Sequence, residues 1–317
     1  MNIFDESLNN YKIALVINCD NNYFEYGLTA IKSFLFHNKW FNGDIVFFDD
    51  EEYFRISEDN INILKTIYKN VIIKKIDFSK YKFIIEKFLN INNNDGSWQC
   101  FLKSYPKIEI FNLKEYDKIL CIDGDILFVD NIKDLFKSSS SLGITSAMLF
   151  NHYYLEGYNL HNLKFKRNDD LVELDSGGFN AGVIYVGNNK FLNKDITNKI
   201  INYINDLLNS YDSTTKLYGS KNIRFFEQCI LNYFFTENYN NEVTYIDPIY
   251  NTELCDIDYL RYEFISNRSN DFLKYLYNNK KILHYLWMPD HIHNNCKNKF
   301  FYKLWSFYNK LPIFLIK

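Results

Sequence analysis

The chain has 317 residues, enough for one large domain or two small ones, and its aromatic content of 19% excludes a largely disordered protein. A formal net charge of −3 at pH 7 provides no basic surface for nucleic acid, so we expect no nucleic-acid partner. Six cysteines without a C-x-x-C pair argue against a zinc cluster and favour a reducing compartment.

Strand-like and helix-like segments alternate from the first strand onward. The apolar run 12–20 predicts a buried strand, and residues 26–37 carry apolar side chains at helical spacing. Further strands are predicted at 44–50, 71–78 and 118–123, and further helices at 60–70 and 104–113. This alternation is typical of an α/β protein with a parallel, doubly wound sheet.

The second half of the chain is less regular. Residues 153–175 are polar and predict a long loop or lid. Because no linker rich in Pro or Gly divides the chain, we expect one domain with insertions. We place an N-terminal tail at residues 1–10, the domain at 11–290, and a C-terminal helical and aromatic extension at 291–317.

The final segment, 300–317, predicts a helix followed by an aromatic tail in which lysines alternate with Trp, Tyr and Phe. This composition allows peripheral contact with a membrane interface, but we favour the alternative, a C-terminal helix packed on the domain. No apolar run is long enough to span a bilayer, and residues 1–10 show no secretory signal pattern, so we expect a cytoplasmic protein.

The most informative segment is Asp123-Gly124-Asp125, which follows the apolar strand 118–123. Residues two apart in an extended segment point to the same side, so the two carboxylates can converge on one hard cation. Gly124 leaves room for a ligand to approach the backbone. Asp-Gly between two apolar strands also predicts a β-hairpin, and on this segment alone both interpretations stay open.

This segment and three other blocks resemble glycosyltransferase family 8, which includes glycogenin and bacterial lipopolysaccharide galactosyltransferases. The blocks occur in the family's order: NCDNNYFEYGLTAIKSFLFHN (18–38), YPKIEIFNLKEYDKILCIDGD (105–125), GGFNAGVIYV (177–186), and FFEQCILNYFF (225–235) followed by KILHYLW (281–287). The resemblance implies a single GT-A type, Rossmann-like nucleotide-sugar-binding domain with a mixed, mostly parallel sheet and a C-terminal helical extension.

The resemblance assigns donor-binding roles by position. Asp20, Asn22 and Tyr23 match the residues that hold uracil, and an aromatic ring can stack on the face of a base. Lys107 matches a basic residue that contacts donor phosphate and sugar, although a lone helical lysine is more often a solvated one. The remaining matches on the donor side are Asp123, Gly124, Ala181 and Gly182.

Metal-binding and catalytic roles follow in the same way. Asp123, Asp125 and His284 match the ligands of a divalent ion, Mn²⁺ or Mg²⁺, although a histidine in an apolar strand is by itself more often a core residue. Asn180, Glu227 and Gln228 match residues beside the anomeric carbon and the sugar hydroxyls. The family more often has Asp at position 227, so the longer Glu is a departure.

The resemblance implies a metal-dependent retaining transferase that moves a hexose from UDP-glucose or UDP-galactose to a glycan, lipid or protein acceptor. By analogy it allows a homodimer. Two alternatives stay open: a UDP-sugar-binding protein with little turnover, and a glycogenin-like self-glucosylating primer. A sugar-nucleotide pyrophosphorylase is disfavoured because NCDNNYFEYG lacks a Gly-rich, basic phosphate loop.

Two further departures bear on these alternatives. No lysine aligns with the family's pyrophosphate-binding residue after the metal histidine, where Met288 or Asp290 stands. Lys297 and Lys299 follow nearby and are the candidates to replace that lysine. Arg224 stands where glycogenin has another carboxylate, which makes self-glucosylation less secure than generic sugar transfer.

Overall fold

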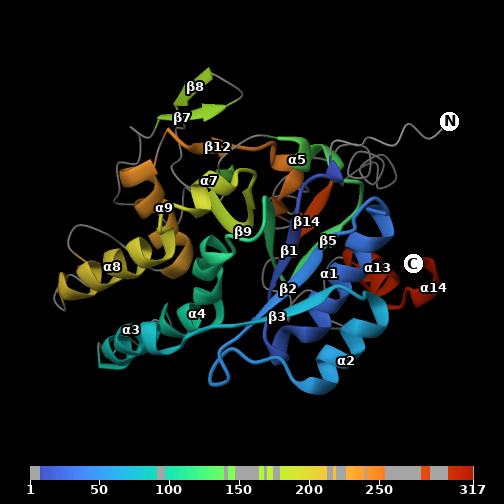
Figure 1. The fold of residues 1–317 in the computed structure, drawn as a ribbon, viewed down its shortest axis with the longest axis horizontal. Helices are drawn as coiled ribbons and strands as arrows, with labels where there is room; N and C mark the ends of the chain where they lie inside the picture. The colour runs from blue at the N-terminus through green and yellow to red at the C-terminus, as the bar shows by residue number, and fades with distance from the viewer. Residues whose placement is uncertain are drawn as a thin grey trace.

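A computed structural model of the protein describes residues 8–90, 97–138, 142–146, 164–167, 170–173, 179–212, 217–218, 226–239, 241–253, 280–285 and 299–316 (Figure 1). Its main feature is a nine-stranded sheet with the strand order β3-β2-β1-β4-β9-β6-β12-β7-β8. The strands are β1 (Ile13–Asn18), β2 (Asp44–Asp49), β3 (Val71–Lys75), β4 (Lys118–Asp123), β6 (Leu142–Ser146), β7 (Lys164–Arg167), β8 (Asp170–Glu173), β9 (Phe179–Val186) and β12 (Val243–Tyr245). The α/β prediction is confirmed.

The sheet is mixed, and its first half is the predicted parallel one. β3, β2, β1 and β4 pair in parallel, whereas β9 is antiparallel to both β4 and β6. Apolar runs such as IALVIN of β1 are buried along nearly their whole length, as expected for strands covered on both faces. The strands predicted at 12–20, 44–50, 71–78 and 118–123 are therefore all present.

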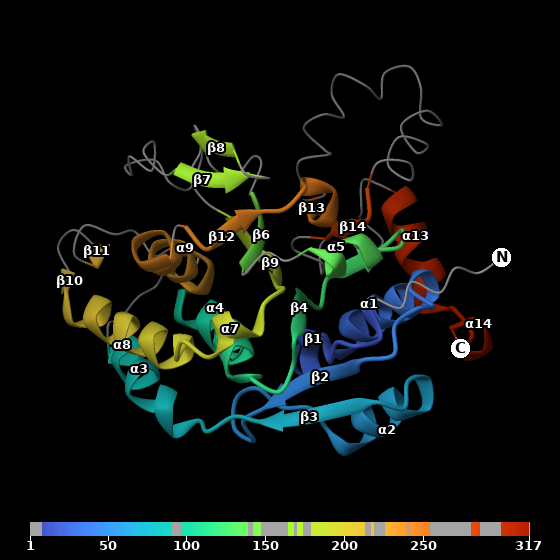
Figure 2. The same cartoon turned by 45° about the horizontal axis from the view of Figure 1, so that its top comes forward.

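Helices cover the two faces of the sheet in separate groups (Figures 1 and 2). One hydrophobic cluster contains side chains of α1 (Phe24–His37), α2 (Glu58–Ile67), α13 (Lys299–Asn309) and α14 (Ile313–Ile316). The other contains side chains of α3 (Ser79–Asn90), α4 (Ser97–Ser104), α8 (Ile196–Asn209) and α9 (Phe226–Tyr239). Two short helices, α5 (Lys133–Lys137) and α7 (Asn189–Leu192), complete the set in the described residues.

The helix predicted at 104–113 is only partly correct. The chain forms α4 up to Ser104 and then a 3₁₀ helix over Tyr105–Asn112. Every residue from 105 to 111 is buried, so the segment has no solvent-facing side that would impose a 3.6-residue period. This buried 3₁₀ helix carries Lys107 toward the end of β4.

The hairpin interpretation of Asp123-Gly124-Asp125 is wrong. β4 lies between β1 and β9, so both of its edges are occupied in the main sheet. The next strand, β5 (Ile126–Phe128), instead pairs with β14 (Ile282–His284), which also pairs with β13 (Thr252–Glu253). The turn therefore connects the main sheet to a second sheet of order β13-β14-β5.

The prediction of a long loop at 153–175 is wrong for its described part. β7 and β8 pair antiparallel there, with Lys164 opposite Glu173 and Arg167 opposite Asp170 in the register. β8 is at the edge of the sheet, where a strand does not need an apolar core pattern. A further small pair joins β10 (Tyr211–Asp212) to β11 (Leu217–Tyr218), and 3₁₀ turns lie at Asn21–Tyr23 and Pro248–Tyr250.

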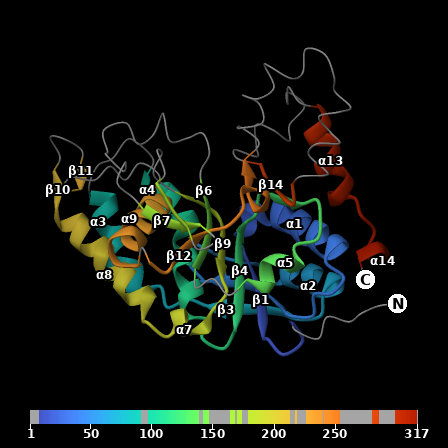
Figure 3. The ribbon, with the colours of Figure 1, turned by 90° about the horizontal axis from the view of Figure 1, so that it is seen from above.

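The C-terminal helices pack against α1 (Figure 3). Trp305 and Tyr308 are buried, and Tyr308 Oη lies 2.6 Å from His37 Nε2. Lys32 Nζ donates to the carbonyl oxygen of Asn309 at 2.6 Å. The described helices include no apolar one long enough to cross a membrane. The domain limits at residues 10 and 290 stay a prediction.

Candidate active site

The predicted site residues gather where β1 and β4 end. The two strands run in parallel with Asn18 opposite Asp123, so the loops that follow them leave the sheet at the same edge. In open α/β sheets, ligands bind at this carboxyl edge. A cavity of about 270 Å³ lies there. It is lined by Asn18, Cys19, Asp20, Tyr23, Phe54, Lys103, Ser104, Lys107, Asp123, Gly124, Asp125, Glu227 and Gln228.

The loop after β1 is held in shape by Asp20. Its carboxylate accepts hydrogen bonds from the backbone N–H groups of Asn22 and Tyr23, each at 3.0 Å, and so caps the 3₁₀ turn that leads into α1. The Asn22 side-chain amide also donates to Asp20, at 3.0 Å, and Asn22 is exposed. Asp20 and Tyr23 line the cavity, whereas Asn22 supports the loop beside it.

Tyr23 presents a partly exposed ring to the cavity. The ring of Tyr26 packs against it at a centroid distance of 5.5 Å, and Lys103 Nζ lies 5.7 Å from its centroid. The second contact is within the range of a cation–π interaction. The ring is therefore fixed in place, which suits it to stacking on a planar ligand.

Asp123, Asp125 and His284 converge although they come from different sheets. One ligand atom from each lies within 4.8 Å of the other two, and His284 Nε2 is 3.3 Å from Asp125 Oδ1. The imidazole is buried, and the Asp123 and Asp125 side chains are 22% and 17% exposed, which leaves the carboxylates accessible from the cavity. Two carboxylates and one imidazole at this spacing fit a divalent cation.

The turn that carries the two carboxylates is packed tightly. A Cβ on Gly124 would lie 3.2 Å from Cys19 Cβ and 3.5 Å from the backbone nitrogen of Gly27. A Cβ on Gly27 would in turn lie 2.5 Å from Cys19 Sγ. The absence of side chains at both positions lets the β4–β5 turn, the β1 loop and α1 meet closely.

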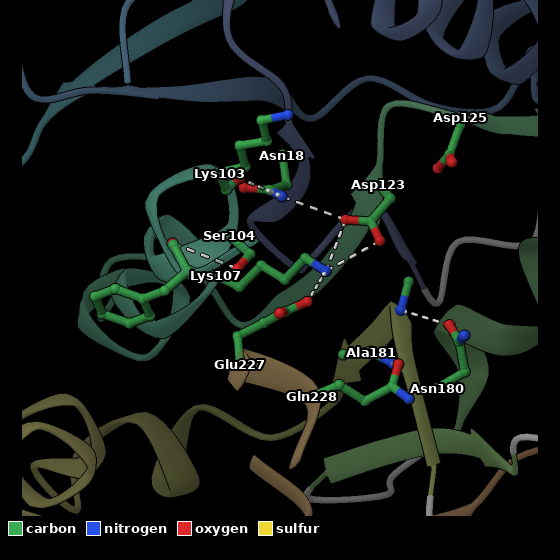
Figure 4. A network of polar contacts seen from close by, with 12 residues as sticks. Asn18, Lys103, Ser104, Lys107, Asp123, Asp125, Asn180, Ala181, Glu227 and Gln228 are labelled. Carbon is green, nitrogen blue, oxygen red and sulfur yellow. Dashed lines mark hydrogen bonds and ion pairs between the residues drawn. The ribbon is translucent and has the colours of Figure 1, made fainter. Parts of the chain in front are cut away.

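Lys107 is a buried cation between two carboxylates (Figure 4). Its Nζ lies 2.8 Å from Asp123 Oδ1 and 3.1 Å from Glu227 Oε1, and its side chain is 3% exposed. Burial by itself lowers the pKa of Lys107, but the attraction of Asp123 and Glu227 prevails and the pKa is raised above its ordinary value. The solvated-lysine interpretation is therefore wrong, and Lys107 joins β4 to α9.

Asn180, Ala181 and Gly182 lie at an irregular point of β9, where its register with β6 shifts. Gln228 Oε1 accepts a hydrogen bond from the Ala181 backbone N–H at 3.1 Å, and Asn180 Oδ1 accepts one from the Gly182 backbone N–H at 2.7 Å (Figure 4). The bend thereby links β9 to Gln228 of α9. Asn180, Ala181 and Gly182 are buried behind the cavity.

The sequence analysis missed several residues of the site, among them Lys103, which lines the cavity. Asn251, directly before β13, is 3% exposed, and its side chain lies between those of Asn180 and His284. No spacing or composition signal marked it. Arg224, Met288, Asp290 and Lys297 lie outside the described residues, as does the side chain of Lys299.

The fold is the GT-A fold of glycosyltransferases. The chain is similar to the galactosyltransferase LgtC solved with donor and acceptor sugar analogues (TM-score 0.60, 18% identity, covering 95% of this chain and 97% of that one). It is also similar to the glycosyltransferase GlyE of Streptococcus pneumoniae TIGR4 (TM-score 0.59, 18% identity), covering 96% of this chain but only 62% of that one. A third similar structure is mouse xyloside xylosyltransferase 1 (TM-score 0.53, 16% identity, 87% and 98% covered).

The chain belongs to glycosyl transferase family 8. The model of that family matches residues 14–288, which span β1 to the residues just after β14. No curated protein sequence matches the chain significantly. The family resemblance read from the four sequence blocks is therefore confirmed.

Proposed function

We propose that the protein is a metal-dependent retaining hexosyltransferase that uses UDP-glucose or UDP-galactose. The observation that carries this proposal is the convergence of Asp123, Asp125 and His284 beside one cavity, with Lys107 and Glu227 on the same side. Membership of family 8 supports the reaction type. The sugar, the metal and the retention of configuration are parts of the proposal.

In this proposal the uridine lies over the loop after β1. The Tyr23 ring stacks on the uracil, and Asp20 holds the loop so that its edge faces the base, with Asn22 supporting it. The diphosphate extends toward the turn at Gly124, which lines the cavity. Lys103 contributes a further positive charge near the ring.

Asp123, Asp125 and His284 would hold the cation. When bound, a divalent cation neutralises the negative charge that develops on the departing UDP. The mixed oxygen and nitrogen donor set favours Mn²⁺ over Mg²⁺, because imidazole is a better ligand for Mn²⁺ than for Mg²⁺. Lys107 positions the carboxylates of Asp123 and Glu227 through its two ion pairs.

The transferred hexose would lie beside Glu227, Gln228 and Asn180. Glycosyl transfer passes through a transition state with positive charge on the sugar ring, as in glycoside hydrolysis. A carboxylate at position 227 stabilises that charge, and the Gln228 amide, which lines the cavity, orients the sugar hydroxyls. Asn180 is buried and its oxygen accepts from Gly182 and Asn251, so it supports this wall of the site. Ala181 and Gly182 supply the bend that brings these groups to the cavity wall.

Release of UDP tests the proposed function. The protein is incubated with Mn²⁺ and a panel of UDP-sugars, with and without EDTA, and its intact mass is then measured. We expect release with one hexose donor, loss of release with EDTA, and loss of release in Asp125→Ala. Asp134→Ala is the matched control, because that side chain is 68% exposed, pairs with Lys137 and Lys281, and does not line the cavity.

The outcomes separate the alternatives. A ladder of hexose additions in the intact mass would identify self-glycosylation, whereas an unchanged mass would point to an external glycan, lipid or protein acceptor. UDP binding without release, across donors and acceptor extracts, would make the chain a UDP-sugar-binding protein. Full activity of Asp125→Ala would refute the metal assignment.

We also propose a cytoplasmic location with peripheral membrane contact. Phe307 and Phe314 are 52% and 77% exposed. Tyr302, Phe307 and Leu315 share one surface hollow with Lys303 and Lys310, a combination that suits an anionic lipid interface. Co-sedimentation with anionic vesicles should fall in Phe314→Ser, and equal partitioning of the variant would reject the contact. A homodimer remains a proposal by analogy, and sedimentation velocity tests it.

A further inference from the structure

A chain of buried side chains connects the backbone of β9 to the imidazole of His284. It begins at the Gly182 N–H, which donates to Asn180 Oδ1 at 2.7 Å. A backbone N–H can only donate, so the Asn180 atom that faces it must be the carbonyl oxygen. This anchors the orientation of the Asn180 amide.

The orientation then passes to Asn251 and His284. The Asn251 side chain approaches the same Asn180 oxygen at 3.0 Å, so it must present its NH₂ group there. Its own oxygen consequently faces His284 Nδ1, at 3.1 Å. Because an amide oxygen only accepts, Nδ1 must carry the hydrogen of this bond, and Nε2 is left to point toward Asp125 at 3.3 Å.

The backbone and the packing hold the same geometry. Asn251 directly precedes β13, and β13 pairs with β14 so that Glu253 lies opposite His284 in the register. A Cβ on Gly182 would lie 2.2 Å from His284 Cε1, so the ring occupies the space that this glycine leaves open. Asn251 and His284 are 3% and 2% exposed, which protects their hydrogen bond from competing water.

We infer that Asn251 is a positioning residue for the metal site. It holds the proton of His284 on Nδ1, which leaves Nε2 as the ligand atom, and it ties the metal side of the site to Asn180 on the sugar side. The inference rests on the proposed function only where it concerns the metal. The protonation of Nδ1 is a property of the folded chain, with or without a cation.

The test combines a spectroscopic readout with metal affinity. Long-range ¹H–¹⁵N correlation of the metal-free protein, with the His284 signal assigned by its loss in His284→Gln, should show a proton on Nδ1 whether or not the ring is charged. In Asn251→Ala the neutral ring should shift toward the form protonated on Nε2. Mn²⁺ affinity, measured by calorimetry with UDP present, should fall by about 10- to 100-fold.

Two variants keep the test independent of folding defects. Asn251→Asp retains an acceptor for Nδ1–H but loses the donor to Asn180, so it should keep the wild-type His284 proton position and Mn²⁺ affinity. Asn38→Ala is the matched control, because Asn38 is equally buried and accepts and donates hydrogen bonds away from the site. It should leave both readouts unchanged even if it destabilises the protein.

The outcomes are distinguishable from failure of the proposed function. The inference would be overturned if the neutral His284 ring of the wild-type protein were protonated on Nε2. It would also be overturned if the Asn251→Ala variant bound Mn²⁺ as tightly as the wild type. Protonation of Nδ1 in a wild-type protein that binds no Mn²⁺ would refute the metal-dependent function but support the role of Asn251 in orienting the ring. Should Asn251→Ala fail to fold, the wild-type and Asn251→Asp measurements still decide.

Discussion

Substitution of Gly182 by alanine should damage metal binding more than it damages folding. The added Cβ would lie 2.2 Å from His284 Cε1, 2.7 Å from Nδ1 and 2.8 Å from Asn180 Oδ1. Ordinary van der Waals contact begins near 3.4 Å, so the ring and the β9 backbone at position 182 must separate by 3.4 − 2.2 = 1.2 Å. Metal–ligand distances tolerate changes of about 0.2 Å, so a shift of this size removes His284 as a ligand.

The expected magnitudes follow from that shift. Overpacking of a buried site costs about 1–3 kcal/mol in the free energy of unfolding, a modest loss for a chain with two hydrophobic clusters. Mn²⁺ affinity in the presence of UDP should fall by at least about 100-fold, because a ligand is lost and not merely misaligned. Calorimetric titration measures the affinity, and urea denaturation measures the unfolding free energy.

Gly43→Ala is the control. Its Cβ would lie 2.3 Å from the carbonyl oxygen of Ile13, at the end of β1 remote from the site, so it should destabilise the fold and leave Mn²⁺ affinity unchanged. If Gly182→Ala bound Mn²⁺ with wild-type affinity, the assignment of His284 as a ligand would be refuted. Equal losses of affinity in both variants would show that the effect is one of stability.

Three other predictions address different parts of the site. Lys107→Met leaves two carboxylates without their shared cation and should lower the free energy of unfolding, measured in urea, by about 3 kcal/mol. Lys114→Met at the surface should lower it little, and equal midpoints for the two variants would contradict the buried ion pairs. Tyr23→Ala should weaken UDP binding by about 1–3 kcal/mol in calorimetry and Tyr23→Phe should not, and an unaffected alanine variant would place the base elsewhere. Burial raises the pKa of the Cys121 thiol to about 12, so at pH 8 only about one molecule in 10⁴ carries the thiolate. Peptide mapping should therefore find Cys121 unmodified after alkylation of the native protein, and rapid labelling would disprove its burial.

The N-terminal half of the fold was predictable because its signals are local. β1 and β4 are continuous apolar runs, and α1 carries its buried side chains at helical spacing. The prediction failed at the 3₁₀ helix, where complete burial of residues 105–111 removes helical periodicity. It failed again at β7 and β8, where polar residues form an edge hairpin and no apolar alternation marks the strands.

The site was predictable only where the family motif or a short spacing marked it. Asp123 and Asp125 are two residues apart, so their convergence could be inferred from strand geometry. Asn251 could not be found, because it contacts His284 and Asn180 across 33 and 71 residues of sequence. Contacts of that kind leave no periodic trace and depend on how strands of two sheets come together.

The hairpin signal at Asp123-Gly124-Asp125 failed for an informative reason. The dipeptide does form a turn, but β4 already has a neighbour on each edge, so β5 must leave the main sheet and pair with β14. Asp123 is consequently held by Asn18 of the main sheet and by Lys107 of the 3₁₀ helix, whereas Asp125 lies against His284 of the smaller sheet. A cation bound by all three side chains would cross-link the two sheets, so its affinity should report how well the sheets are docked. Asn251 contributes to that docking as the ligands do, because it precedes β13 and contacts His284 of β14.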